Sequence, residues 1–250
     1  MTESVSETPL AEVPKPEPKP NSFQRIVGVL TAPDETFRSI VRRPDWLIPL
    51  LIILVLAVTS AVLLVPRIDI ATSMQEQAEA QNRPIDPQAM KFVTAFFKIA
   101  MYASPVISVA MIAIIAMLLL VAFRIFGGEG EFSQAFSIVL YSWMPQLIRS
   151  ILACTVLLQK PSFTFTQAAE PIRSNLSFLF SMKTQPLLFA LFGSLDIFTL
   201  WTLFLLVVGF ARMSRFSKAK SAAIVLTMWI CMTALKLIGP AFAQMKAGKD

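Results

Sequence analysis

The sequence predicts an all-α membrane protein, a helical bundle of five transmembrane helices with amphipathic interfacial helices at its N-terminus. Of the 250 residues, 55% are hydrophobic and only 15% are charged, whereas a typical soluble domain has about 25% charged residues. The mean hydropathy is +0.65. The hydrophobic residues are concentrated in five long runs, which a soluble fold of this size has no means of covering.

Each of the five apolar segments has about 20 residues or more, enough to cross a hydrocarbon core of about 30 Å. The segments lie approximately at residues 46–65, 99–123, 135–158, 186–211 and 221–240. Pro105 and Pro145 fall inside the second and third segments. Because proline removes a backbone hydrogen bond, we expect both helices to be kinked.

The region before the first segment divides into two parts. In residues 1–21 proline alternates with other residues, which is typical of a disordered, solvated tail on the cytosolic side, or of a peptide that docks on a partner. Residues 22–45 repeat apolar side chains at helical spacing and predict two amphipathic helices, on the membrane surface or on the cytosolic mouth of the bundle. The domain plan continues with a five-span domain at 46–240 and a short C-terminal tail at 241–250.

The positive charges predict the orientation. With the N-terminus inside, nine Lys and Arg residues lie in 40 inner-loop residues and eight lie in 64 outer-loop residues, and cytosolic loops carry the excess of such residues. We therefore expect a cytosolic N-terminus and an external C-terminus. Arg38, Arg42 and Arg43 would face lipid phosphates. A second candidate, a basic cytosolic face, consists of Arg212, Arg215, Lys218 and Lys220.

The composition removes several kinds of catalytic site. The chain has no histidine, so histidine acid–base catalysis and the usual zinc, copper and haem ligation are excluded. Cys154 and Cys231 lie inside apolar segments without metal-ligand spacing and are interpreted as buried, inert thiols. No nucleophile elbow or kinase motif occurs. We expect no catalytic residues, no cofactor and no metal.

Ionisable residues within the apolar segments are the remaining candidates for a site. Asp196 lies about ten residues into the fourth segment, where an unpaired carboxylate costs roughly 2.5–3.5 kcal/mol. Arg149 and Lys236 are its candidate partners. The acid is open to three interpretations: an ion pair that fixes helix packing, a proton or ion relay, and a protonated, hydrogen-bonded group. A lone acid without histidine favours packing.

Several motifs resemble those of bacterial members of the Yip (Ypt-interacting protein) family. They are F-x-R-I-x-G-V-L-T-x-P-x-E-T-F from Phe23 to Phe37, R-R-P-D-W-L-x-P-L from Arg42 to Leu50, a Gly-rich turn before Phe132, the stretch from Tyr141 to Pro145, and S-L-D-I-F-T-L-W from Ser194 to Trp201. The resemblance covers residues 22–240. It implies a five-span protein of the bacterial cytoplasmic (inner) membrane, without catalytic residues. Asp196 and Trp201 are the positions it marks as characteristic, followed by Pro44, Asp45 and Pro145.

The resemblance also bears on function. Eukaryotic relatives bind Rab-type GTPases, a role that is not transferred to a bacterial chain. The favoured function is non-catalytic, in membrane organisation or in recruiting protein partners through the N-terminal tail and the cytosolic loops. We expect the lipid bilayer to be a partner and nucleic acid not to be one. The sequence leaves open whether the chain forms a homo-oligomer or a hetero-oligomer. The alternative is a small-solute or ion transporter that uses Asp196 and the kinked helices. A lipid-handling enzyme is disfavoured by the missing metal and acid–base residues.

Overall fold

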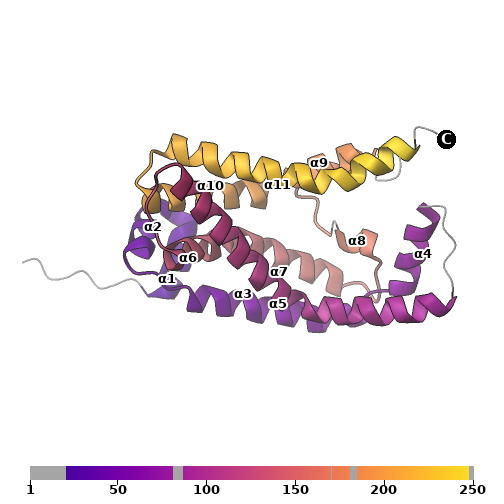
Figure 1. Cartoon of the computed structure of the whole chain (residues 1–250). Coiled ribbons are helices and arrows are strands. Elements are labelled where there is room, and N and C mark those ends of the chain that lie inside the picture. The colour runs from indigo at the N-terminus through magenta and orange to yellow at the C-terminus, as the bar shows by residue number, and fades with distance from the viewer. Residues whose placement is uncertain (1–20, 81–86, 170, 181–184, 248–250) are drawn as a thin grey trace, which may run out of the picture.

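The computed structural model describes residues 21–80, 87–169, 171–180 and 185–247, and these residues are almost entirely helical (Figure 1). The predicted tail and the last residues of the chain lie outside the described part. The helices are α1 (Ser22–Thr31), α2 (Pro33–Arg42), α3 (Leu47–Leu64), η1 (Val65–Arg67), α4 (Ile70–Ala80), α5 (Pro87–Ile125), α6 (Phe132–Ser142), α7 (Met144–Leu158), α8 (Phe165–Ala169), η2 (Ser177–Leu179), α9 (Pro186–Ser194), α10 (Ile197–Ser214) and α11 (Lys218–Ala247).

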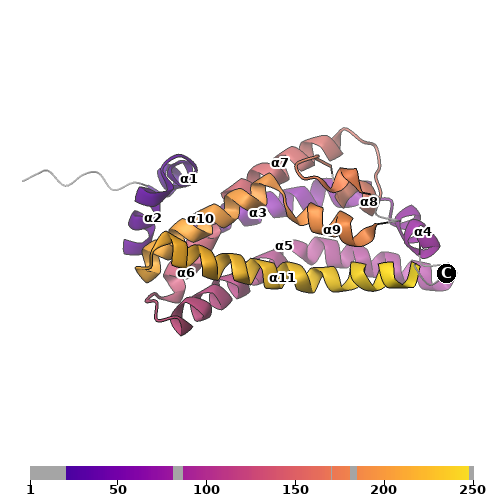
Figure 2. The same ribbon diagram turned by 90° about the horizontal axis from the view of Figure 1, so that it is seen from above.

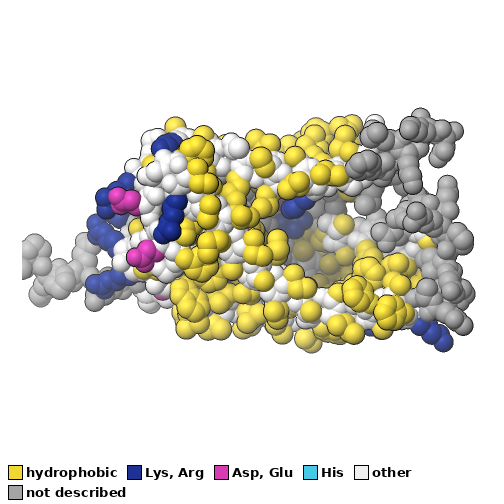
Figure 3. Space-filling view, in the orientation of Figure 1, with side chains coloured by type: hydrophobic (Ala, Val, Ile, Leu, Met, Phe, Trp, Pro, Cys, Tyr) yellow, Lys and Arg dark blue, Asp and Glu magenta, His cyan; other side chains and the backbone are white. Residues whose placement is uncertain are grey.

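The two ends of the elongated bundle differ in composition. One end, called the head from here on, consists of α1, α2, α6, the last turns of α10 and the first turns of α11 (Figures 1 and 2). The far end carries α4, α8 and the end of α11. The chain passes between the two ends along α3, α5, α6–α7, α9–α10 and α11. Charged side chains gather mainly at the head, and hydrophobic side chains cover most of the surface beyond it (Figure 3).

Four helices in the described residues are long and apolar enough to cross a membrane. They cover Leu47–Arg67, Met90–Ile125, Ile197–Ser214 and Lys218–Gly239. The third expected segment, residues 135–158, is divided into α6 and α7, with 11 and 15 residues. The predicted all-helical class is confirmed, and the described residues contain four helices of spanning length rather than five.

The break between α6 and α7 falls at Trp143, and Pro145 lies in the first turn of α7. A backbone N–H in the first turn has no partner within the helix, so proline is tolerated there at no cost. Pro145 therefore begins a helix rather than kinking one. Pro105 differs, since α5 continues on both sides of it. The fourth expected segment is also divided, because α9 ends at Ser194 before α10 begins.

The largest fully buried side chains, among them Phe37, Phe123, Tyr141 and Phe210, lie in or next to the head. Phe123 of α5 stacks on Phe210 of α10 with ring centroids 4.9 Å apart. A β-carbon on Gly209 would lie 2.4 Å from Ile138 Cγ2 and 3.1 Å from the Phe37 ring. The glycine thus lets α2 and α6 approach the same turn of α10, so that these three helices form one packed unit.

The spanning segments are exposed along most of their length. The share of buried residues is 17% in the first, 28% in the second and 11% in the last, against 56% in the segment that belongs to α10. Exposing this much apolar helix surface to water would be strongly unfavourable, whereas in a bilayer the same surface faces lipid. The chain is an integral membrane protein, with most side chains of α3, α5 and α11 directed outward.

Candidate functional site

Asp196 lies at the break between α9 and α10, where its side chain is only 3% exposed. Its Oδ1 accepts hydrogen bonds from the backbone N–H groups of Phe198 at 2.8 Å and Thr199 at 3.3 Å. Asp196 is therefore the N-cap of α10. A carboxylate at this position satisfies free N–H groups and lies at the positive end of the helix dipole.

Two groups from other parts of the chain reach the second carboxylate oxygen of Asp196. The hydroxyl of Ser174 donates to Oδ2, and Nε of Arg149 on α7 lies 3.4 Å from the same atom. Lys236 is exposed on α11 and has no ion pair within the described residues. The structure therefore brings Asp196 together with Arg149 and not with Lys236.

Polar contacts extend from this pair toward the head. Gln146 Nε2 lies 3.4 Å from both Thr199 Oγ1 and Thr202 Oγ1 and links α7 to α10. Trp201 packs against the hydrophobic core instead. The order S-L-D before an apolar run is an N-cap pattern that identifies the start of α10. Ser174 has no comparable signal, because it comes from a separate segment 22 residues away.

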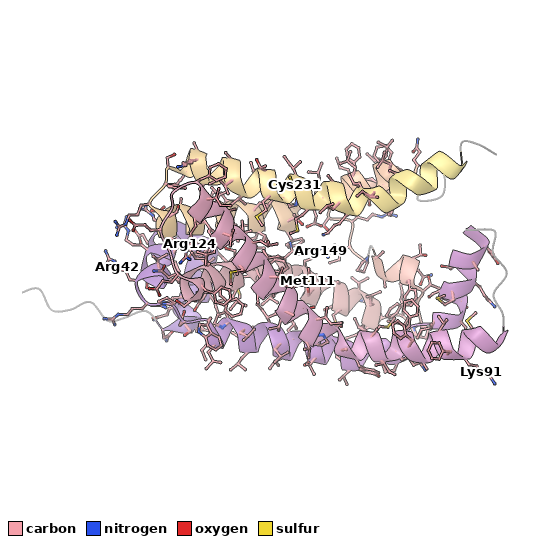
Figure 4. The ribbon with its side chains drawn as sticks, viewed as in Figure 1. Arg42, Lys91, Met111, Arg124, Arg149 and Cys231 are labelled. Carbon is pink, nitrogen blue, oxygen red and sulfur yellow. The ribbon has the colours of Figure 1, made fainter. Side chains whose placement is uncertain are left out.

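The contact with Asp196 engages only one of the nitrogen atoms of Arg149. Its Nε is buried without a hydrogen bond of good geometry, yet the whole side chain is 31% exposed. The terminal nitrogen atoms have no acceptor in the described chain and are not among its buried, unpartnered atoms. Figure 4 shows Arg149 in the space between α11 and the side of the bundle formed by α5 and α7. A guanidinium has five N–H donors, and most of these remain free.

A groove of about 560 Å³ lies between α3, α5 and α7. Its lining includes Ala153, which is four residues after Arg149 and therefore on the same face of α7. Figure 3 shows that this side of the molecule is hollowed between α5 and α11. The two helices meet at the head, where Lys220 Nζ donates to the carbonyl of Phe126 at 3.0 Å, and they diverge toward the far end (Figure 1).

Two residues of the candidate basic face, Arg212 and Lys218, form a clamp with Asp34 of α2. Arg212 donates from Nε to Asp34 Oδ1 at 3.0 Å and from Nη2 to Oδ2. Lys218 Nζ lies 3.4 Å from Asp34 Oδ1. The hydrogen bond from Arg212, with smaller contributions from the charges of Arg212 and Lys218, holds the pKa of Asp34 below its ordinary value of 3.8.

The other two residues of the face are also engaged with the chain itself. Arg215 Nη1 lies 3.4 Å from Glu129 Oε2 in the glycine-rich turn. Lys220, besides its bond to a carbonyl, places Nζ 3.6 Å from the centre of the Phe216 ring, an arrangement that favours a cation. All four predicted residues of the basic face thus have partners inside the head.

A second polar cluster in the head surrounds Asp45, a position that the family resemblance marks but whose partners no sequence pattern predicts. Arg25 Nη1 lies 3.0 Å from Asp45 Oδ1, the Tyr141 hydroxyl donates to the same oxygen at 2.8 Å, and the Ser22 hydroxyl donates to Oδ2 at 2.6 Å. Arg25 Nη1 also donates to the carbonyl of Arg43 at 2.9 Å. These residues belong to separate motifs of the sequence that only the fold brings together.

The outward face of the head carries free positive charge. Arg38, Arg42 and Arg43 of α2 and its end are exposed, and their side chains have no ion pair within the described residues. Arg42 lies at the outer end of the head (Figure 4). On the adjoining helix α1, Phe23 and Val27 are 69% and 49% exposed.

The structure corrects the expectation for the cysteines. Cys154 is half-buried beside the groove, and Cys231 is exposed on α11. An apolar segment of a membrane helix faces lipid as readily as protein, so position in such a segment does not imply burial. Over the described residues, no three His, Cys, Asp or Glu side chains come together as metal ligands would.

The comparisons with known proteins agree with this architecture. A family model described as the Yip1 domain matches residues 27–238. The membrane protein YknW of Bacillus subtilis (strain 168) is 24% identical over 202 residues, which cover 80% of this chain and 81% of YknW. No solved structure matches the chain significantly.

Proposed function

The chain belongs to the Yip1 domain family, and from this premise we propose that it is a non-catalytic membrane protein that recruits a protein partner at its head. The observation that carries the proposal is the contrast between two sets of basic residues. Those in α10 and α11 are neutralised or bonded within the head. Those on α2 are exposed and unpaired in the described chain.

The recruiting surface is therefore α2 rather than the run from Arg212 to Lys220. Arg38 and Arg42 are four residues apart and share one face of the helix. An acidic segment of the partner is the complementary surface, since opposite charge steers association and fixes its register. The N-terminal tail, which precedes α1, is a second contact for the same partner.

The proposed topology has five crossings of the bacterial inner membrane. α7 provides the third crossing, with about 22 Å of helix continued by α6 at the head. The head is cytosolic and the C-terminus is external. Labelling of Ser4→Cys and Gly248→Cys in a chain without Cys154 and Cys231 tests this: an impermeant thiol reagent added to intact cells should label only the second, and labelling of both would refute the topology.

The partner is tested by crosslinking in native membranes. A photoreactive amino acid in place of Arg42 should capture one protein. In the charge variant, Arg38, Arg42 and Arg43 are replaced by Gln and the photoreactive amino acid is placed at Glu35 instead. This variant should no longer capture the protein, and its melting temperature should be unchanged. The matched control replaces Lys91 and Lys98, which are exposed on α5 near the far end. Equal capture by the two charge variants would overturn the proposal.

The transporter alternative has one observation in its favour, the break beside Asp196 between two half-helices. Discontinuous helices line the transport sites of many carriers. Reconstituted vesicles separate the alternatives: a transporter loses flux in Asp196→Asn while protein yield is kept. Under the proposed function neither the unaltered chain nor the variant gives flux of the tested solute, and the variant affects stability alone.

A further inference from the structure

The groove between α3, α5 and α7 has small side chains on all three of its walls. Ala57 and Ser60 on α3, Ser104 on α5, and Ser150 and Ala153 on α7 belong to its lining, and the remaining lining is predominantly apolar. Its volume of about 560 Å³ is within the range of about 300–1,000 Å³ for ligand pockets. The groove lies between membrane helices, so an apolar chain is the ligand that its lining suits.

Arg149 does not itself line this groove, but Ala153, one helical turn further along α7, does. At one end of the α3–α7 pair Tyr141 contacts Asp45, and at the other end Arg67 Nη1 donates to the carbonyl of Leu158 at 2.7 Å. Leu158 is roughly 14 Å of helix from Arg149, and α7 begins five residues before Arg149, at Met144. At such a depth in a bilayer a cation is unfavourable by about 2.5–3.5 kcal/mol unless it finds acceptors.

The carboxylate of Asp196 does not accept hydrogen bonds from the terminal N–H groups of Arg149. Its Oδ1 is occupied by two backbone N–H groups, and its Oδ2 by Ser174. Arg149 approaches it only through Nε, at 3.4 Å. The terminal nitrogen atoms are left to face the hollow, and the planar pair of N–H groups on a guanidinium matches the oxygens of a phosphate.

We propose that the hollow binds one anionic phospholipid of the bilayer, with its phosphate at the terminal nitrogen atoms of Arg149 and one acyl chain in the groove of α3, α5 and α7. The lipid enters sideways between α5 and α11, where the hollow opens toward the bilayer (Figure 3). Ala153 lies between the two parts of the site. The proposal is independent of partner recruitment, because no residue of the head takes part.

Native mass spectrometry of the full chain tests the proposal. The protein is purified in neutral detergent and titrated with phosphatidylglycerol or with diacylglycerol of the same acyl chains, which lacks the phosphate. We expect one phosphatidylglycerol per chain, preferred over diacylglycerol by about tenfold, the factor that about 1.4 kcal/mol of charge-assisted hydrogen bonding to the phosphate provides. Equal retention of the two lipids would overturn the proposal.

Three variants locate the site. Arg149→Gln removes the phosphate contact and should abolish the preference for phosphatidylglycerol. Ala153→Trp and Ser104→Trp fill the groove from different walls and should reduce retention of the lipid without removing a charge. These two variants test the proposal if Arg149→Gln does not fold. Lys91→Gln is the matched control, with the same loss of charge at the far end of α5, outside the groove lining, and should bind as the unaltered chain does. Retention that is unchanged in both tryptophan variants contradicts the proposal.

Discussion

Arg212 and Asp34, which are 178 positions apart, are joined by two hydrogen bonds from one guanidinium to the two oxygens of one carboxylate. The pair ties α2 to α10, and Lys218 extends it to the first turn of α11. Bidentate pairs of this kind are stronger than single ion contacts and fix orientation as well as distance. The short N-terminal helices are thus held on the membrane bundle by charge as well as by the packing of Phe37.

Breaking this clamp should loosen α2 without unfolding the spans. For Asp34→Asn we expect a loss of about 1 kcal/mol, the upper part of the range for partly exposed ion pairs, seen as a lower melting temperature in detergent and as faster proteolysis between α1 and α2. Glu35→Gln is the control, because Glu35 is exposed on the same helix and has no ion pair in the described residues. An equal effect of the two variants would contradict the clamp.

The clamp also predicts a response to acid. Since the pKa of Asp34 is lowered in the folded chain, the unfolded chain binds the proton more readily, and the stability from this group is present above its ordinary pKa of 3.8. That stability is lost as the pH falls through the lowered pKa. The difference in melting temperature between the unaltered chain and Asp34→Asn should therefore be constant near neutral pH and shrink below pH about 3.8. A difference that persists at the acid end argues against the assignment.

Two glycines in the membrane helices should respond oppositely to alanine. A β-carbon on Gly209 meets Ile138 Cγ2 at 2.4 Å in the core of the head, and overpacking of this kind costs about 1–3 kcal/mol. A β-carbon on Gly239 meets nothing within 4 Å, and alanine is the better helix former by about 1 kcal/mol. We expect Gly209→Ala to lower the melting temperature and Gly239→Ala to keep or raise it. Similar shifts in both would show that helix propensity, not packing, dominates.

Asp196 has two structural roles that substitution can separate. Asn keeps an oxygen for the N–H groups of Phe198 and Thr199 but removes the charge beside Arg149, whereas Ala removes both. Loss of an N-cap costs about 0.5–2 kcal/mol, so Asp196→Ala should destabilise the chain more than Asp196→Asn by roughly this amount. The melting temperatures of the two variants measure it. Ser194→Ala is the control, since the Ser194 hydroxyl donates only within its own helix, to Ala190 at 2.9 Å.

Much of the architecture follows from local properties of the sequence. Apolar runs of spanning length and the scarcity of charge determine that α3, α5 and α11 face lipid, because the hydrophobic effect acts on each segment separately. The helical repeat before Trp46 identifies α1 and α2 in the same way. Asp196 also stands out locally, as an acid in an apolar segment with arginine as a candidate partner.

Only the tertiary structure decided how the polar residues are used. The basic run from Arg212 to Lys220 has the sequence of an exposed face, yet Asp34, Glu129 and the carbonyl of Phe126 come to it from other helices. Trp143 divides a segment whose composition suits a continuous helix, whereas the start of α10 is marked locally, by Asp196 as the N-cap of that helix. Composition and period report what one segment prefers, whereas the partner of a charge is set by contacts between segments far apart in the chain, which no local pattern contains.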